Sequence, residues 1–307
     1  MQQLMHQMNE RVIGQSKNIK LLLAAFLSGG HVLLEGVPGI GKTKMVRTLA
    51  ELTDGRFNRV QFTPDMMPSD ITGSVIFNMK DNEFQTVKGP VFANMLLADE
   101  INRTPPKTQS ALLEAMEEKQ VTIQGRTYPL PDPFFVIATQ NPVEYEGTYP
   151  LPEAQLDRFL FKLTVSYPSV ESEFDILKGH LAGRTVSDGV SRPPVMTLER
   201  LKEQRAALRE VVVEDSIVAY IAALIRSTRE SKQMLLGASP RAGIAMMNAA
   251  RAWALLDGRS FVTPDDVKIV AVPALRHRLL LTPQAELEGE TSDHFIQDTL
   301  ASVPIPR

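Results

Sequence analysis

The stretch Gly36-Val37-Pro38-Gly39-Ile40-Gly41-Lys42-Thr43 matches the pattern G-x-x-x-x-G-K-[ST] and decides the fold. The apolar run HVLLE (31–35) precedes it and the helical pattern KTKMVRTLAEL (42–52) follows it. In this context the glycines let backbone N–H groups converge on phosphate oxygens at a helix amino terminus. Lys42 is expected to neutralise the β- and γ-phosphates, and the Thr43 hydroxyl to bind Mg²⁺. An ordinary glycine turn is the alternative, but such a turn does not require the Lys-Thr pair.

Short apolar runs alternate with amphipathic stretches from residue 31 to about 166, which is typical of strands and crossover helices in a parallel sheet. Near-continuous apolarity is what a sheet covered by helices on both faces requires. The runs are His31 to Leu34, Arg59 to Phe62, Met95 to Ala98, Phe134 to Thr139 and Phe161 to Val165. After Pro168 the apolar residues recur at helical spacing. We therefore expect an α/β domain over 1–168, with a parallel sheet flanked by helices, and a smaller all-α domain over 169–307.

Two carboxylates directly follow the apolar run that ends at Ala98. Ligands of parallel sheets gather at the carboxyl ends of the strands. Asp99 is therefore expected to hold Mg²⁺, directly or through water, and Glu100 to align and polarise a water that attacks phosphate. A strand that runs into a solvated acidic turn is the alternative, which the phosphate-binding loop upstream disfavours.

Another apolar run, 134–140, leads to Asn141, which stands before Pro142. Proline biases the residue before it toward an extended conformation. The Asn141 amide could then sense the γ-phosphate or fix the attacking water. Turn chemistry alone also explains an Asn-Pro pair.

Composition and charge limit the class of protein. A net charge of −3 and a pI near 6.0 provide no surplus of Lys and Arg for nucleic acid. The absence of cysteine excludes disulfides and thiolate metal sites and fits a reducing cytoplasm. No apolar run approaches the roughly 20 residues that span a bilayer, and the amino-terminal MQQLMHQMNERVIG lacks the apolar stretch of a secretory signal. We expect a cytoplasmic protein that neither inserts into membranes nor binds nucleic acid.

These motifs, in this order, resemble those of the MoxR family within the AAA+ ATPases, and the similarity covers nearly the whole chain. GVPGIGKT resembles the Walker A motif, LLADE (96–100) the Walker B motif and ATQNP (138–142) sensor 1. LPEAQLDRFLFK (151–162) resembles the segment that bears the arginine finger, and GASPRAG (237–243) resembles sensor 2. The resemblance implies an AAA+ P-loop NTPase fold in which the all-α domain is the lid.

The resemblance also assigns site residues. Asn141 would be sensor 1, Arg158 the finger that reaches a neighbour's nucleotide, and Arg241 sensor 2 on the lid, while Val12 and Ile13 would lie near the adenine. An ion pair at the surface is the alternative for Arg158, and a solvated charge at a helix start is the alternative for Arg241. The expected catalytic residues are Glu100, Asn141, Arg158 and Arg241. The expected ATP-binding residues are Val12, Ile13, Gly36, Val37, Pro38, Gly39, Ile40, Gly41, Lys42, Thr43 and Arg241, and those for Mg²⁺ are Thr43 and Asp99.

An arginine finger implies an assembly. A guanidinium at the transferring phosphoryl group can accelerate the reaction by roughly 10³ to 10⁵, and head-to-tail contacts close into rings or run on as filaments. The resemblance favours a hexameric homo-oligomer that hydrolyses ATP to remodel or mature client proteins, including metal or cofactor insertion, often with a von Willebrand type A domain partner. A nucleic-acid motor and a nucleotide-gated scaffold are the alternatives; the acidic pI disfavours the first, and Asp99 with Glu100 disfavours the second.

Three other segments have interpretations that bear on partners. The family carries two inserted hairpins, for which Gly73 to Lys88 and Lys119 to Pro131 are strand-like candidates. Phe77 and Phe84 could grip a client, but we expect them to pack on each other across the first hairpin. Arg276-His277-Arg278 is interpreted as a solvated helix end rather than a nucleic-acid patch.

Overall fold

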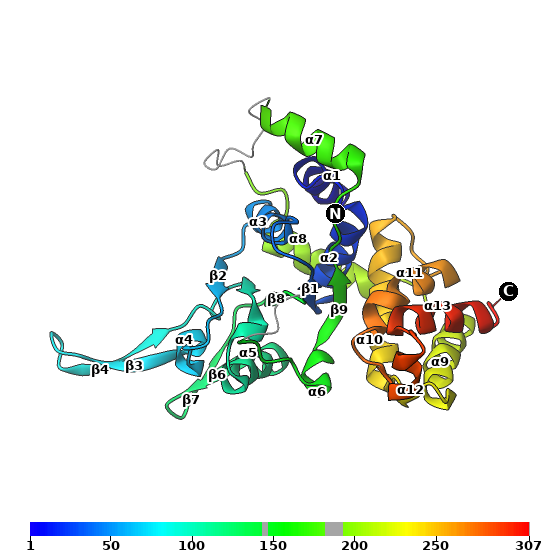
Figure 1. Cartoon of the computed structure of the whole chain (residues 1–307). Helices are drawn as coiled ribbons and strands as arrows, with labels where there is room; N and C mark the ends of the chain where they lie inside the picture. The colour runs from blue at the N-terminus through cyan, green and yellow to red at the C-terminus, as the bar shows by residue number, and fades with distance from the viewer. Residues whose placement is uncertain (143–146, 182–192, 307) are drawn as a thin grey trace.

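A parallel sheet with helices on both faces forms the first half of the chain in the computed structural model, which describes residues 1–142, 147–181 and 193–306 (Figure 1). Its five strands lie in the order β2-β5-β8-β1-β9, and all neighbours are parallel. The strands are β1 His31–Glu35, β2 Phe57–Gln61, β5 Met95–Asp99, β8 Phe135–Gln140 and β9 Phe159–Thr164. Each predicted run forms one of these strands, so the α/β prediction is confirmed.

Alternate residues of the central strands enter two different apolar cores. In β5, Leu97 faces the core shared with α1 (Gln2–Arg11), α2 (Ser16–Ser28) and α3 (Lys42–Glu51), whereas Leu96 faces the core of α5 (Pro106–Glu118). Successive side chains of a strand point to opposite faces, so a sheet covered twice needs apolar residues at nearly every position. On α5 the buried residues include Leu112, Leu113 and Met116.

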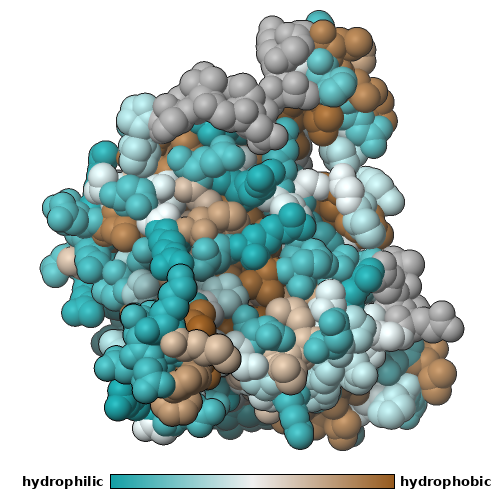
Figure 2. All heavy atoms as spheres, turned by 90° about the vertical axis from the view of Figure 1, so that its left-hand side faces the viewer, coloured by the Kyte–Doolittle hydropathy of each residue, from teal (hydrophilic) through white to brown (hydrophobic). Residues whose placement is uncertain are grey.

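Both expected hairpins are present. The first pairs β3 (Gly73–Asn78) with β4 (Glu83–Lys88) and projects from the body beside the short helix α4, Pro68–Thr72 (Figure 1). The second pairs β6 (Gln120–Ile123) with β7 (Arg126–Pro129). Phe77 and Phe84 pack edge to face with ring centroids 5.2 Å apart, as expected, although both remain exposed. Figure 2 views the molecule from the side of the first hairpin, where apolar side chains form small areas within a largely hydrophilic surface.

In the described part of the second half, the regular elements are helices and one short antiparallel strand pair. Two of its helices begin at a hydroxyl residue that stands before proline: Ser239 caps α10 by accepting from the Ala242 N–H, and Thr263 caps α11 by accepting from the Asp266 N–H. The elements after β9 are α7 Val170–Leu181, α8 Leu198–Arg209, α9 Asp215–Glu230, β10 Met234–Leu236, α10 Pro240–Leu256, α11 Pro264–Leu275, β11 Leu280–Leu281, α12 Pro283–Leu287 and α13 Ser292–Ser302.

One apolar core runs through both halves of the molecule. It extends from Leu4 in α1 through α2 to Trp253 in α10 and Phe295 in α13. A domain boundary near Pro168 therefore stays a prediction, because this core is continuous across it. Among the described residues, no helix is both long and apolar enough to span a bilayer.

Candidate nucleotide-binding site

The phosphate-binding loop connects the end of β1 to the first residue of α3, Lys42. Gly39 and Gly41 have φ angles of +83° and +93°, a left-handed region that favours glycine, and open space surrounds a Cβ placed on either. The Lys42 ammonium donates to the carbonyl oxygen of Gly36 and, at 3.4 Å, to that of Gln140. The ammonium therefore lies over the loop, and together with the amino terminus of α3 it can hold a phosphate group.

Asp99 is the last residue of β5, and two neighbouring strands hold its carboxylate. Oδ1 accepts from the Thr139 hydroxyl of β8 at 2.6 Å, and Oδ2 accepts from the Arg59 guanidinium of β2 at 2.8 Å. The same Thr139 oxygen accepts from the Glu100 N–H at 2.9 Å. This network fixes the carboxylate at the carboxyl end of the sheet.

Glu100 adopts a left-handed conformation with φ +57°, which is uncommon outside glycine and strains the turn after β5. Its carboxylate accepts from the Gln61 side-chain amide at 2.6 Å and pairs with Arg103 at 3.0 Å. Gln61 ends β2, so the strand beside β5 orients the group that the sequence assigns to the attacking water.

The predicted residues from three adjacent strands come together at one edge of the sheet. The loop follows β1, Asp99 and Glu100 end β5, and the buried Asn141 follows β8. Thr43 is the second residue of α3 and is half-buried. The Thr43 hydroxyl and the Asp99 carboxylate are hard oxygen donors of the kind that Mg²⁺ prefers. The open loop, the ammonium and these oxygens fit a magnesium nucleotide.

The residues assigned to the adenine lie close to the same edge. Val12 is buried in the core, Ile13 is half-buried, and a Cβ on Gly14 would lie 3.3 Å from Pro168. A Cβ on Gly36 would lie 2.5 Å from the carbonyl oxygen of Val165. The segment 165–168 therefore passes beside both the amino-terminal residues and the loop. The roles of Val12 and Ile13 stay predictions.

Arg158 lies at the opposite edge of the sheet, away from the loop of its own chain. His31 pairs with Phe159 and Glu35 with Thr164, so Arg158 stands where β1 begins, whereas the loop follows the end of β1. At about 3.3 Å per residue, the strand separates the two edges by roughly 16 Å. Within its own chain, Arg158 is therefore remote from the phosphate-binding loop.

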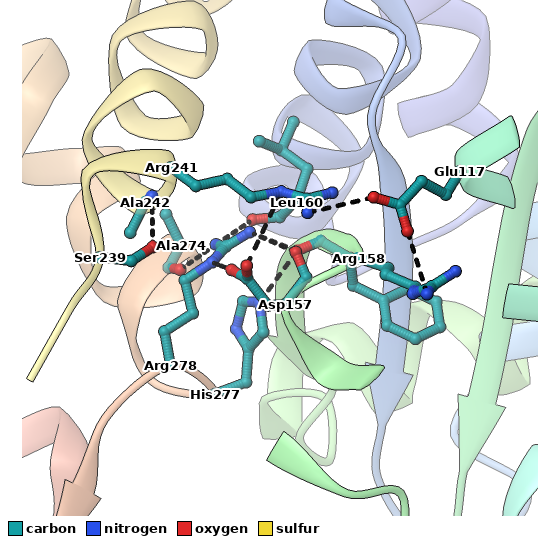
Figure 3. Close-up of polar contacts among 11 residues, drawn as sticks. Glu117, Asp157, Arg158, Leu160, Ser239, Arg241, Ala242, Ala274, His277 and Arg278 are labelled. Atoms are coloured by element: carbon teal, nitrogen blue, oxygen red, sulfur yellow. Dashed lines mark hydrogen bonds and ion pairs between the residues drawn. The ribbon is translucent and has the colours of Figure 1, made fainter. Parts of the chain in front are cut away.

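Arg241, in the first turn of α10, joins Arg158 at this edge (Figure 3). One carboxylate, that of Glu117, pairs with Arg158 at 3.0 Å and with Arg241 at 3.3 Å. The structure thus brings the two predicted arginines to each other and not to the loop of the same chain.

The interpretation of Arg276-His277-Arg278 as a solvated helix end is wrong. His277 and Arg278 are buried where the helical half meets the sheet, and Arg276 pairs with Asp293 at 2.6 Å. Burial, reinforced by the neighbouring Arg278 charge, lowers the pKa of His277 well below its usual value, so the ring is neutral. The three residues follow α11, and the docking of that helix against β9 takes them out of water.

Several polar residues of the two edges were missed by reasoning from the sequence. Arg59 and Gln61 lie two positions apart in β2, a spacing that places both on one face of a strand, and this was the available signal. Asp157 stands beside Arg158 in the finger segment, and Glu117 lies in the last turn of α5. Their partners come from other elements, which no local pattern indicates.

Known proteins share this architecture. Residues 31–161 match the family described as "ATPase family associated with various cellular activities (AAA)", and residues 226–299 match the AAA lid domain. The fold and these matches define an AAA ATPase domain followed by its lid.

Similar proteins of known name narrow the class of AAA ATPase further. Chaperone MoxR1 of Mycobacterium tuberculosis is 46% identical over 305 residues, which cover 96% of this chain and 80% of that protein. Protein MoxR of Methylorubrum extorquens is 31% identical over 319 residues, covering 96% and 92%. A solved structure from Cytophaga hutchinsonii aligns with a TM-score of 0.91 at 43% identity, covering 99% of this chain and 94% of that one. The chain belongs to the MoxR family of AAA+ ATPases.

Proposed function

We propose that this protein hydrolyses ATP, with Mg²⁺, at sites formed between the subunits of a homo-oligomeric ring, and that the cycle remodels or matures a client protein. One observation carries the proposal: Arg158 and Arg241 share the edge of the sheet opposite to the loop of their own chain. An arginine finger must touch the transferring phosphoryl group. Across roughly 16 Å of sheet it serves the nucleotide of another subunit.

The loop edge, the edge of the sheet that carries the phosphate-binding loop and the carboxylates, brings together residues with separate tasks. Lys42 and the N–H groups of the loop bind the β- and γ-phosphates, and Thr43 with Asp99 hold the Mg²⁺, which neutralises developing charge when bound. Glu100, oriented by Gln61, aligns the attacking water. Asn141, buried beside these residues, fixes the water or senses the γ-phosphate.

The neighbouring subunit completes the site with Arg158 and Arg241. Such a contact joins two different surfaces, the loop edge of one subunit and the arginine edge of the next, so repeating it forms either a closed ring or an open filament, of which we propose the ring. The resemblance to the family supports six subunits. A relative named a chaperone supports a client protein, and a von Willebrand type A domain protein is the partner we propose.

Mixed assemblies test the shared site. Lys42→Ala should lose nucleotide binding, Arg158→Ala should bind ATP and turn over slowly, and Glu100→Gln should bind ATP without hydrolysis.

In an equal mixture of Lys42→Ala and Arg158→Ala subunits, about a quarter of the interfaces pair an intact loop with an intact finger. ATPase activity should recover to about that fraction. No recovery, when native mass spectrometry shows mixed rings, would overturn action between subunits. The Glu100→Gln protein mixed with Arg158→Ala serves as the control, because Arg158→Ala subunits retain an intact loop and Glu100→Gln subunits an intact finger, so it should recover equally.

A further inference from the structure

Arg278 is a buried cation whose hydrogen-bonding capacity is fully used. It is 9% exposed and lies between α11 and the start of β9 (Figure 3). Its Nε donates to Asp157 Oδ1 at 2.5 Å, and its four other N–H bonds are directed to backbone carbonyl oxygens. The carbonyls belong to Asp157, Phe159, Leu160 and Ala274. Burying a charge is costly unless it is paired and fully hydrogen-bonded, and Arg278 meets both conditions.

The acceptors of Arg278 lie on both sides of Arg158. Nη2 donates to the carbonyl oxygen of Asp157 at 3.1 Å and to that of Phe159 at 2.8 Å, so one guanidinium from the helical half holds the backbone before and after the finger. The sheet and α5 also hold this segment, because Phe159 pairs with His31 and the Arg158 guanidinium donates to the Leu113 carbonyl oxygen at 2.6 Å. Arg278 adds a connection from the lid to the backbone on both sides of Arg158.

The same carboxylate connects Arg278 to Arg241. Asp157 binds Arg278 through Oδ1, and its Oδ2 lies 3.7 Å from Arg241 Nε. Together with Glu117, which pairs with both Arg158 and Arg241, three arginines and two carboxylates form one network with a surplus positive charge. The network lines a hollow of about 230 Å³. Of its three arginines, Arg158 and Arg241 are accessible to solvent, as are the two carboxylates, whereas the Arg278 side chain is enclosed.

We propose that Arg278 is a positioning residue that fixes Arg158, and through Asp157 also Arg241, as one unit for the phosphates of the neighbouring subunit. The inference rests on the proposed function, because it concerns the same shared site. It adds a physical coupling: a lid movement displaces the finger with it, since their connection is a buried, fully bonded guanidinium. Arg278 itself reaches no nucleotide.

Lysine cannot replace this arginine. It has three donors on one nitrogen and no planar fork, so several buried carbonyl oxygens would lose their donors although the charge remains. A displacement of about 1 Å in a catalytic group can cost roughly 100-fold in rate. We expect Arg278→Lys to lower kcat about 100-fold and to leave the Kd for ATP unchanged, since the loop lies at the other edge of the sheet.

The matched control lies on the same lid. Arg226 and Glu230 form an ion pair at 2.7 Å on α9, with side chains 76% and 62% exposed. Exposed pairs of this kind contribute little to stability, so Arg226→Lys should leave kcat and the Kd for ATP as in the wild type. Asp157→Asn is the second test variant, because it weakens the same pair without removing the guanidinium. Asp157→Asn should lower kcat as Arg278→Lys does, and circular dichroism checks that both variants remain folded.

Rings of mixed subunits distinguish a displaced Arg158 from a general loss of activity in the Arg278→Lys protein. Mixed with Lys42→Ala, the Arg278→Lys protein should regain activity, because its intact loops then meet intact arginine edges. Mixed with Arg158→Ala, it should regain none, since both proteins lack a working finger. Recovery with Arg158→Ala, or none with Lys42→Ala in verified mixed rings, would overturn the inference. Failure of the Lys42→Ala and Arg158→Ala pair itself would instead overturn the proposed function.

Discussion

His31, the first residue of β1, shows how a buried residue can be held in one protonation state. The Val136 N–H donates to its Nδ1 at 3.0 Å, and its Nε2 lies 3.2 Å from the Met116 carbonyl oxygen, so Nε2 carries the proton. Burial lowers the pKa of His31 to about 4; the hydrogen bond to Met116 opposes this change, and the charges of Lys119 and Arg205 add to it. Protonation of Nδ1 would break the bond from Val136.

The stability of the protein should therefore depend on pH through His31. The folded pKa of about 4 lies below the unfolded value of 6.5, so the unfolded chain binds a proton first. The contribution of neutral His31 to stability is fully present above pH 6.5 and is lost as the pH falls toward 4. This lowers the free energy of unfolding by on the order of 3 kcal/mol. Urea unfolding at about pH 7 and about pH 4.5 measures it.

The variant His31→Gln isolates this effect. Glutamine keeps one donor and one acceptor but does not titrate, whereas all carboxylates and the neutral His277 remain. The variant should lose less stability than the wild type between the two pH values. Equal losses in both proteins would show that His31 titrates normally in the folded chain.

At the residue scale, the sequence identifies groups whose chemistry is local. Lys42 and Thr43 follow from one motif, and Asp99 follows from a strand end, because the chain around each residue fixes its place at the carboxyl end of the sheet. Arg278 could not be found in this way. Apart from Ala274, its acceptors lie about 120 residues earlier in the chain, so its role depends on how the lid docks on β9.

At the scale of elements, Asp266 fixes the start of α11, the helix that leads to Arg278. Its carboxylate is 2% exposed and accepts from Arg259 through both oxygens, at 2.5 and 2.6 Å. Oδ2 also accepts from the Thr263 N–H at 2.8 Å, which completes a capping box. The Asp266 side chain thus accepts a hydrogen bond from the backbone at the start of the helix and neutralises the charge of Arg259.

We expect Asp266→Ala to destabilise the protein by about 2 to 3 kcal/mol, because it removes a helix cap and leaves Arg259 without its main partner. The matched control is Asp265→Ala, one position earlier, where the side chain is 83% exposed and the change should stay within about 0.5 kcal/mol. Thermal unfolding monitored by circular dichroism measures both. A similar loss in the two variants would contradict a special role for Asp266.

The regular elements could be predicted where the pattern is long or capped. The five strands of the sheet follow from apolar runs, and the starts of α10 and α11 coincide with a hydroxyl residue before proline, which is a signal of a helix start. The pair β10–β11 could not be predicted, because segments of three and two residues are too short to show a period. The register between β2 and β5 places Arg59 and Gln61 beside Asp99 and Glu100. It comes only from the structure, because it depends on pairing between strands that no local pattern specifies.

At the scale of the whole molecule, the sheet separates the two groups of residues that the proposed function unites between subunits. One edge holds the loop and the carboxylates, and the other holds Arg158 and Arg241, with five residues of β1 between them. The strand order that produces this separation is β2-β5-β8-β1-β9, which the apolar runs alone do not specify. The family resemblance predicted the residues, and the structure places them at opposite ends of β1 within one chain.

Dilution should therefore lower the activity of each subunit. If both edges are needed, ATPase activity per subunit falls as rings dissociate, whereas a site complete within one chain would give a constant value. We expect activity to follow the assembled fraction measured by analytical ultracentrifugation over the same concentrations. ATP binding should persist in the dissociated chain, because Lys42 and the loop belong to one subunit. A monomer that hydrolyses ATP at the rate of the assembled protein would contradict a divided site.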